Sequence, residues 1–522
     1  MGQYLIRASL CAVVLLAIGC SVNPVTGENQ LSLISTSQEL AIGEKNYLPS
    51  QQSQGGQYTV DASLQAYIAE VGQTLAAVSD APDLPYEFVV LNNSVPNAWA
   101  MPGGKIAINR GLLSLLNDES ELAAVLGHEV VHAAARHGAS QMTRSTFIGL
   151  GSQIAAIAAQ TQGYGQLGGL AAQLGGGAWL AKYGRDDELE SDYYGMKYMS
   201  LAGYSPEGAV RLQELFVSLK NGKQQDFLSQ LFASHPPSQE RVKANIERAA
   251  TLPRGQTFRE RYQRKTAQLR KDKGAYEAQK KAMSALKEKK GKQALKFLDE
   301  AIAIQPNDGQ FWELRGHAWE MLGNHSNAEK AFSTAIRKSP DYFAPKLYRG
   351  LLRYENGNKA GAREDLKASY AILPTQVAAF HLGELAMASG DQQSALSFYR
   401  SASGGKGEVS GQARARLVTL ELAQMPDKYI LSKTYIDRNG MLRVAVKNNS
   451  GIAVSGVRVQ LAQLTSRTSM GRAQNLRGSY NLKPGQEISI KTGVGPFESA
   501  AAANNYRARV AAARPAKTAK RI

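Results

Sequence analysis

Cysteine is nearly absent from this sequence. The 522 residues include only two cysteines, Cys11 and Cys20, which lie close together near the N-terminus. They cannot form a disulfide framework, and Cys/His zinc-finger motifs are absent. Long apolar runs are missing as well, since none reaches the roughly 18–20 residues of a membrane-spanning helix. A polytopic membrane protein is therefore excluded.

Acidic residues are scarce relative to basic ones. Lys and Arg number 61 against 44 Asp and Glu, so the formal net charge is +17, which indicates an anionic partner or surface. Apolar residues make up 43% of the chain and charged residues 20%, which is a globular composition. A chain of 522 residues is too long for one hydrophobic core and predicts about three or four domains.

The first twenty residues account for both cysteines. A single basic residue precedes the short apolar run ASLCAVVLLAIG, so residues 1–19 have the form of a secretory signal peptide. The run ends in AIGC, which is similar to a bacterial lipobox, and we predict that Cys20 is lipidated and becomes the mature N-terminus. Ser21 at the next position is typical of sorting to the outer membrane. The alternative is an ordinary signal peptide with an incidental cysteine.

Composition changes divide the next 230 residues. Residues 20–60 are polar and rich in Gln and Ser, which predicts a tether with one short helix near 37–46. Helical and strand patterns alternate over 61–250, with a strand at 86–92 and a hairpin at 98–111 that turns at PGG (102–104). We assign 61–250 to one mainly helical α+β domain.

Residues 145–184 form a long segment of small and apolar residues within this domain. The segment has no charged residue between Arg144 and Lys182, so it is neither a solvated linker nor a conventional disordered tail. Three interpretations remain open: a buried helical hairpin, a hinged cover over the site, and a face that contacts the membrane surface.

Residues 254–296 are strongly basic, with fifteen Lys and Arg against four Asp and Glu in helix-favouring sequence. We predict a basic linker helix over 254–274 and attraction of the whole stretch to anionic lipid headgroups or an acidic partner. A solvated helix face is the alternative.

A period of 33–34 residues runs through 275–405. Small residues and prolines recur in phase: Ala294, Ala328, Ala362 and Ala395; Gly316, Gly350 and Gly383; Pro306, Pro340 and Pro374. Small residues let paired helices approach closely and each proline ends a helix, which is typical of tetratricopeptide repeats. We predict about four of them, an α-solenoid with a concave groove for peptides or proteins, in preference to a generic helical bundle.

Strand patterns dominate after residue 428. Short alternating runs separated by turn signals such as Asn439-Gly440 predict an all-β, sandwich-like domain over 428–498. Residues 499–522 contain six basic and no acidic side chains, and we predict a frayed basic tail.

One predicted helix carries the chemistry. Asp118 and Glu121 have the spacing of a capping box, and the helix that follows is predicted to end at Gly138. His137, near that end, is predicted to face the terminal carbonyl groups of the helix and not a metal.

The motif HEVVH lies in the middle of this helix. His128 and His132 are four residues apart and share a helical face, so both imidazoles can bind one Zn²⁺. Glu129 lies beside the metal position, where a carboxylate can polarise water. A surface helix with incidental histidines is the alternative, but the apolar residues around the motif would bury the helix.

A catalytic zinc site needs a third protein ligand. The acidic stretch at 185–195 contains Glu188 and Asp192 four residues apart on one face, while Glu190 points away. We predict that Glu188 binds zinc and that Asp192 orients a ligating histidine. The alternative is a solvated acidic face.

His235, in the sequence HPP, and Arg241 form the remaining polar cluster. We predict that His235 donates to the oxyanion of a tetrahedral intermediate or fills the open zinc position at rest. The alternative is a structural histidine at the start of a helix.

Four motifs together resemble the HtpX/Ste24-type gluzincin zinc metallopeptidases: HEVVH, ELESD, NAWAMPGGKIAINRGLL and HPPSQER. In that family Glu-x-x-x-Asp supplies the third zinc ligand and its partner, which agrees with Glu188 and Asp192. Joined to the repeats, the chain is similar to BepA-like periplasmic lipoproteins. Within the long motif we take Asn97, Gly104 and Ile106 as candidates for a strand that binds substrate.

The resemblance implies one Zn²⁺ per chain and an endopeptidase anchored by lipid, facing the periplasm, and acting on misfolded or stalled envelope proteins. It also implies contact with outer-membrane assembly machinery, and we expect no nucleic-acid partner. A repeat-based chaperone or scaffold with a latent peptidase site is the alternative.

Overall fold

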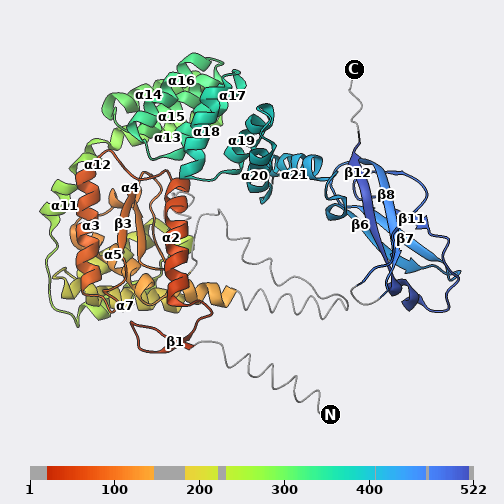
Figure 1. Cartoon of the computed structure of the whole chain (residues 1–522). Coiled ribbons are helices and arrows are strands. Elements are labelled where there is room, and N and C mark those ends of the chain that lie inside the picture. The colour runs from red at the N-terminus through yellow and green to blue at the C-terminus, as the bar shows by residue number, and fades with distance from the viewer. Residues whose placement is uncertain (1–19, 146–182, 221–230, 406, 466–468, 517–522) are drawn as a thin grey trace, which may run out of the picture. The chain divides into compact units, whose positions relative to one another are not determined.

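The computed structural model describes residues 20–145, 183–220, 231–405, 407–465 and 469–516. The chain divides into two compact units, Met1–Arg349 and Gly350–Ile522 (Figure 1). Over the described ranges, no helix combines the length and the apolar character that crossing a bilayer requires.

A three-stranded sheet lies at the centre of the first unit. Its strands are β3 (Glu87–Leu91), β4 (Ala98–Met101) and β5 (Lys105–Asn109). Their order is β3-β5-β4, with β3 parallel and β4 antiparallel to the central strand β5. The predicted strand at 86–92 and the hairpin that turns at 102–104 are therefore confirmed.

Both faces of this sheet are buried, which explains why its strands are apolar except at the end positions Glu87, Lys105 and Asn109. Val90, Ile106 and Ile108 pack into the main core beside the helices α3 (Ala62–Ala77) and α5 (Glu119–Ala134). Alternate residues such as Leu91 and Ala107 pack instead with Tyr47 of helix α2 (Thr36–Ser53). In Figure 1, α3 and α2 accordingly lie on opposite sides of β3.

The remaining helices of this part complete the core. They are α4 (Arg110–Leu113), α7 (Arg185–Leu201), α8 (Glu207–Lys220), α10 (Gln239–Ala249), α11 (Arg259–Lys265) and α12 (Ala267–Lys271). The prediction for 254–274 is right about helix, since α11 and α12 lie there, but wrong about a linker. Tyr262 and Leu269 are buried in the main core, and the Tyr262 hydroxyl donates to the Leu113 carbonyl oxygen.

Residues 20–60 do not form the predicted tether. Strands β1 (Cys20–Val22) and β2 (Asn29–Leu31) pair as a hairpin, and α2 extends over eighteen residues. Their polar side chains bind the end of α5 and the loop after it: Gln30 Nε2 donates to the Ala135 carbonyl oxygen, and Glu39 pairs with Arg136. The polar composition suggested a solvated segment, but these polar groups contact protein instead of water.

The predicted repeats are helix pairs. Within the described residues 273–403, eight helices form four pairs: α13 (Lys273–Lys287), α14 (Gly291–Ile304), α15 (Gly309–Met321), α16 (His325–Lys338), α17 (Phe343–Glu355), α18 (Lys359–Ile372), α19 (Gln376–Ala388) and α20 (Gln392–Ser403). A ninth helix, α21 (Glu408–Glu421), follows.

The periodic small residues lie where the helices touch. A methyl group at Gly316, Gly350 or Gly383 would come within 2.4, 2.9 and 2.6 Å of Phe332, Leu366 and Tyr399 respectively, each on the paired helix. The periodic prolines stand two residues after α14, α16 and α18 end. Close approach and helix termination are thus the physical reasons for the 33–34-residue period.

The second unit ends in a β domain of two sheets. One has the order β11-β7-β6, formed by β6 (Ile430–Ile436), β7 (Leu442–Asn448) and β11 (Glu487–Lys491). The other has the order β10-β8-β12, formed by β8 (Val454–Gln463), β10 (Tyr480–Leu482) and β12 (Tyr506–Pro515), with β9 (Gln474–Asn475) also paired to β8.

The predicted frayed tail at 499–522 is wrong for its described part. Strand β12 pairs with β8 along most of its length, and Val510 and Ala513 enter the domain core. The alternating arginines of this segment lie on the exposed face of a strand whose other face is buried. Its alternation of apolar and polar residues is a strand pattern, but the high charge of the segment made it resemble a solvated tail.

Candidate metal centre

Two helices cross at a pair of glycines and bring the predicted residues together. A methyl group at Gly195 of α7 would lie 3.1 Å from the backbone nitrogen of His128, and one at Gly127 of α5 would lie 3.2 Å from the Gly195 carbonyl oxygen. A side chain at either position would require the neighbouring backbone to shift by a few tenths of an ångström, so glycine favours this close approach. The crossing sets Glu188 and Asp192 of α7 against the histidines of α5.

The start of α5 is held by buried carboxylates. The Asp118 side chain caps the helix by accepting from the Glu121 backbone nitrogen, and the guanidinium group of Arg211 pairs with both residues. Glu121 accepts from the backbone nitrogen of Asn117, so the predicted capping box is completed one residue earlier than its usual form.

The end of α5 differs from the prediction. The helix ends at Ala134, not at Gly138, because Arg136 adopts a left-handed backbone conformation with φ of 63°. Ion pairing between Arg136 and Glu39 of α2 holds that turn.

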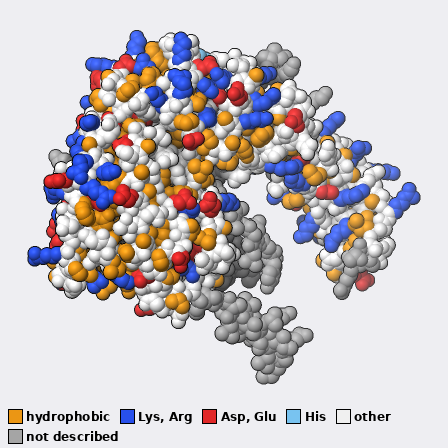
Figure 2. Space-filling view, turned by 60° about the vertical axis from the view of Figure 1, so that its left-hand side comes forward, with side chains coloured by type: hydrophobic (Ala, Val, Ile, Leu, Met, Phe, Trp, Pro, Cys, Tyr) orange, Lys and Arg blue, Asp and Glu red, His pale blue; other side chains and the backbone are white. Residues whose placement is uncertain are grey.

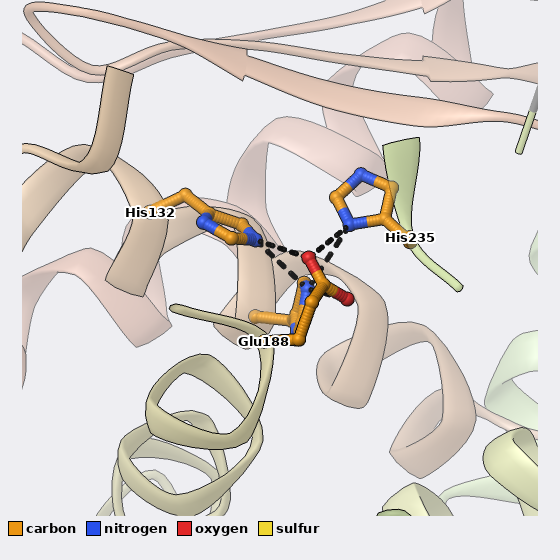
Figure 3. A group of neighbouring side chains, drawn as sticks. His132, Glu188 and His235 are labelled. Carbon is orange, nitrogen blue, oxygen red and sulfur yellow. Dashed lines mark hydrogen bonds and ion pairs between the residues drawn. The ribbon is translucent and has the colours of Figure 1, made fainter. Parts of the chain in front are cut away.

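Four donor atoms converge beside the middle of α5. His128 Nε2 lies 3.0 Å from His132 Nε2 and 3.2 Å from His235 Nδ1. Glu188 Oε1 lies 3.3 Å from His132 Nε2 and 3.1 Å from His235 Nδ1. Figure 3 shows the side chains of His132, Glu188 and His235 pointing toward one another. All four residues are buried, and their donor atoms lie within 4.8 Å of one another, an arrangement that fits one metal ion.

A second layer of charge holds these donors. Asp192 Oδ1 lies 3.0 Å from His128 Nδ1, the ring nitrogen that faces away from the cluster. Arg241 donates from Nε and Nη2 to the two oxygens of Asp192, both at 2.7 Å, and from Nη1 to Glu188 Oε2 at 2.5 Å. The predicted polar partner Arg241 therefore fixes both carboxylates of α7.

The electrostatics of the cluster favour a positive charge among the donors. Burial alone would lower the pKa of His128, but Glu188 and Asp192 raise it to about 10. Burial would raise the pKa of Glu188, yet the neighbouring His235, His128 and Arg241 hold it well below the usual value. The Glu188 carboxylate is thus ionised, as a metal ligand must be.

Glu129 lies next to the donors without joining them. The residue is 2% exposed, and its Oε1 lies 3.4 Å from His235 Nε2. Its Oε2 and the Nε2 of His235 have no hydrogen-bond partner among the described residues. Leaving a buried carboxylate oxygen unpaired is costly, so this oxygen can accept a hydrogen bond from water or a bound ligand.

Comparison with known proteins assigns this arrangement to a family. The profile of Peptidase family M48 matches residues 62–249. Metalloprotease YcaL of Escherichia coli (strain K12) is 34% identical over 192 residues, which are 35% of this chain and 72% of that protein. The chain belongs to Peptidase family M48. A tetratricopeptide repeat profile matches 280–343 and 322–377, so the M48 domain is followed by such repeats.

Two further relatives match a smaller share of their own length. Mitochondrial metalloendopeptidase OMA1 of Schizosaccharomyces pombe is 34% identical over 196 residues, 37% of this chain and 55% of that protein. The beta-barrel assembly-enhancing protease of Yersinia pestis is 29% identical over 191 residues, 35% of this chain and 38% of that protein. The chain thus spans about half the length of the first of these relatives and just over a third of the length of the second.

His137 contacts His132 of the donor cluster, a position that the sequence did not indicate. Its Nδ1 lies 2.8 Å from His132 Nδ1, and its Nε2 lies 3.3 Å from Glu190 Oε1. Asn23, in the N-terminal segment, donates to the same Glu190 oxygen. The prediction that His137 faces the helix carbonyls is wrong, because the early end of α5 turns this residue back toward His132.

Tyr183 is a second residue that the sequence gave no reason to select. Its ring stacks on His132, with the ring centroids 3.6 Å apart, and its hydroxyl donates to the Ala100 carbonyl oxygen of β4 at 3.3 Å. It fixes the orientation of His132 and links the M48 helices to the edge of the sheet.

The predicted substrate-strand residues have different surroundings. Ile106 lies in β5, whose two edges are paired with β3 and β4, and the Gly104 carbonyl oxygen accepts from the Glu87 backbone nitrogen. The prediction is therefore wrong for Ile106, because its strand is paired along both edges. For Gly104, of whose backbone the carbonyl oxygen has a partner, a substrate-strand role stays a prediction. Asn97 directly precedes the edge strand β4; both polar atoms of its buried side chain have no partner among the described residues.

An apolar pocket adjoins Glu129 and His235. Its walls are mainly buried aliphatic, thioether and aromatic side chains from α4, α5, α7 and α8, including Leu112, Val125, Met199, Leu212 and Phe216. Such a pocket accepts an apolar side chain next to the donor cluster.

Two predicted features lie outside the described residues. They are the signal peptide at 1–19 and nearly all of the segment 145–184, for which a hairpin, a cover or a membrane contact was expected. Lipidation of Cys20 stays a prediction.

Proposed function

We propose that the chain is a zinc-dependent endopeptidase with one Zn²⁺ per chain. The observation that carries this proposal is the buried convergence of His128, His132 and Glu188 beside Glu129, whose Oε2 has no hydrogen-bond partner among the described residues. Two imidazoles and a carboxylate are a donor set that zinc prefers in catalytic sites.

The residues have separate roles in this proposal. His128, His132 and Glu188 would hold the ion, while Asp192 keeps His128 in the tautomer that presents Nε2. Bound zinc supplies Lewis acidity toward a water molecule and the scissile carbonyl group. Glu129 accepts one proton of the attacking water and passes it to the leaving amine, so that water adds across the broken peptide bond.

His235 would control access to the site. Its Nδ1 lies 3.1 Å from Glu188 and 3.2 Å from His128, which is the position of a fourth ligand. Substrate must displace it, after which its imidazole can donate to the developing oxyanion.

We extend the proposal to substrate and location. The chain would be a lipid-anchored periplasmic protein, attached through Cys20 to the outer membrane, that cleaves misfolded or stalled envelope proteins. Support comes from the lipobox-like segment, from the repeats, and from a relative named for β-barrel assembly. The repeats would dock the substrate or a component of the assembly machinery. The finer HtpX/Ste24 and BepA-like assignments rest on the motif resemblance.

A second function is favoured by the position of His235. A donor cluster already closed by its own histidine suits a chaperone or assembly scaffold in which the peptidase is mostly latent.

The Glu129→Gln variant separates the two functions. We expect hydrolysis of unfolded casein to fall by a factor of about 10²–10⁴ while bound zinc is unchanged, because the base is lost and the ligands remain. Glu207→Gln, at an exposed position of α8, is the matched control and should keep full activity. Unchanged hydrolysis by Glu129→Gln would refute the mechanism, and full support of envelope integrity by an inactive Glu129→Gln would favour the scaffold.

A further inference from the structure

One outer sheet face of the C-terminal β domain carries a row of arginines. Arg458 lies on β8, and Arg507, Arg509 and Arg514 lie on β12; all four side chains are exposed. We call this surface, formed by the four residues, the arginine face.

Strand register places the four side chains on the same side of the sheet. Arg509 pairs with Gln460 and Arg507 with Ala462, and Ala512 pairs with Arg458. Directly paired residues of antiparallel strands point to the same face. The intervening Val457, Val459, Val510 and Ala513 fill the core behind the arginines. Irregular register near Ala512 brings the exposed Arg514 back to this side, beside Gly456.

Among the described residues, no ion pair neutralises the charge of the arginine face. Strands β8, β9, β10 and β12 contain no Asp or Glu. Over the described part of the chain, no ion pair involves any of the four arginines, whereas Arg443 of the opposite sheet pairs with Asp437. The Arg509 Nε donates to the neutral Gln460 side chain. On the part of the β domain seen in Figure 2, Lys and Arg side chains are accordingly frequent and acidic ones few.

We infer that the arginine face binds the phosphate headgroups of an anionic phospholipid surface. Guanidinium groups pair with phosphate through two parallel hydrogen bonds, and a broad sheet face matches a layer of phosphates better than a single bound ion. The inference rests on the proposed envelope location, where the chain would meet such a surface, and it does not depend on the metal centre.

The same observations disfavour other anionic partners. None of the large exposed hydrophobic side chains among the described residues belongs to β8, β9, β10 or β12, so an acidic protein would find no apolar anchor there. Single-stranded nucleic acid needs aromatic platforms for stacking, which the exposed positions of these strands also lack.

Co-sedimentation with vesicles tests the inference. The full chain carrying Cys20→Ser, which prevents acylation, is mixed with phosphatidylcholine vesicles with or without phosphatidylglycerol. We expect binding only with phosphatidylglycerol, and loss of binding near 1 M salt, where the Debye length is about 3 Å. Replacing the four arginines by glutamine should weaken binding at least about tenfold.

Two matched variants give the controls. Lys433, Lys447, Lys483 and Lys491 are exposed in the same domain but outside the face, so their replacement by glutamine removes the same charge and should leave binding close to that of the parent. Replacing the four arginines by lysine keeps the charge but loses the paired hydrogen bonds, so this variant should bind more weakly than the parent and more tightly than the glutamine variant. Casein hydrolysis should be unchanged in every variant, which keeps this test separate from that of the proposed function.

Several results would overturn the inference. They are absence of parent binding to phosphatidylglycerol vesicles, equal losses in the arginine and lysine sets, and loss of binding by the arginine-to-lysine variant although it melts like the parent. Tighter binding of the face to polyglutamate or to a DNA fragment than to vesicles would assign it to a protein or nucleic-acid partner instead.

Discussion

Asp192 Oδ1 lies 3.0 Å from Nδ1 of His128, on the side of the imidazole opposite the donor cluster. An anionic acceptor at this position keeps a proton on Nδ1 and leaves the Nε2 lone pair for a metal. Arg241 holds the same carboxylate through two hydrogen bonds and holds Glu188 through a third. The orientation of two donors therefore depends on one arginine.

Asp192→Asn should weaken metal binding without removing a ligand. The amide has nearly the same shape but carries no charge, so His128 loses the anion that fixes its tautomer, and we expect zinc affinity to fall about 10–100-fold. Competition with a chromophoric chelator measures the change. Asp186→Asn, at an exposed position of the same helix, is the control and should bind zinc like the parent. Equal affinities for both variants would show that Asp192 does not support the site.

Gly195→Val should disrupt the centre from outside it. The first side-chain carbon alone would lie 3.1 Å from the His128 backbone nitrogen, so the branched side chain must push α7 away from α5. Because Glu188 and Asp192 move with α7, we expect most bound zinc to be lost, together with about 2–3 kcal/mol of stability from overpacking. Zinc analysis of the purified protein and thermal unfolding measure both effects.

A glycine with free space around it provides the comparison for this variant. Gly411 of α21 has no atom near the position of an added methyl group. Gly411→Val should therefore change neither zinc content nor the stability of the first unit. Full zinc content in Gly195→Val would mean that the helix crossing does not set the site.

The sequence was sufficient for the parts of the site that lie within one element. His128, Glu129 and His132 follow from helical spacing, and Glu188 and Asp192 from a second such spacing on α7. Each pair shares a face by geometry alone, so no tertiary information is needed. The repeats were predictable for the same reason, since their period reflects contacts between neighbouring helices in sequence.

Residues whose position depends on where an element ends could not be predicted. His137 reaches the centre only because α5 stops at Ala134 and Arg136 turns left-handed, held by Glu39 from a segment expected to be a tether. Strand β12 was hidden because arginines occupy its exposed face. Polar side chains occur both in segments that contact solvent and in segments that contact protein, so polar composition alone cannot distinguish the two.

Arg110 joins the M48 domain to the first repeats within the first unit. Its guanidinium carbon lies 3.4 Å from the centre of the Tyr276 ring, and its Nε and Nη2 donate to Asn92 and Gln279. Asn92 and Tyr276 in turn donate to the buried Asp308. Burial lowers the pKa of Arg110 and raises that of Asp308, so each charge depends on the other across this junction.

Arg110→Met should loosen this junction. The substitution keeps an unbranched apolar stem but leaves Asn92, Gln279 and Asp308 without their cation, at a cost of about 2–3 kcal/mol. We expect faster hydrogen exchange in α13 and α15 and a lower melting temperature. Lys271→Met, at an exposed cation of α12, should leave both unchanged. Unchanged exchange in Arg110→Met would show that the remaining contacts hold the junction without it.

Glu421 should make the stability of the second unit depend on acidic pH. Its side chain is 2% exposed, and burial alone would raise its pKa, but hydrogen bonds from Lys428, Tyr429 and Arg400 lower it to about 2. Because the unfolded value is about 4.3, the carboxylate stabilises the fold above that pH and loses this effect as pH falls toward 2. Screening at the half-exposed Arg400 and Lys428 limits the contribution to about 1–2 kcal/mol.

Glu421→Gln should therefore speed hydrogen exchange around 413–430 near neutral pH, with the difference from the parent disappearing near pH 2. Glu408→Gln, exposed on the same helix, should match the parent throughout, and a Glu421→Gln effect that is constant with pH would assign the role of Glu421 to packing instead of charge.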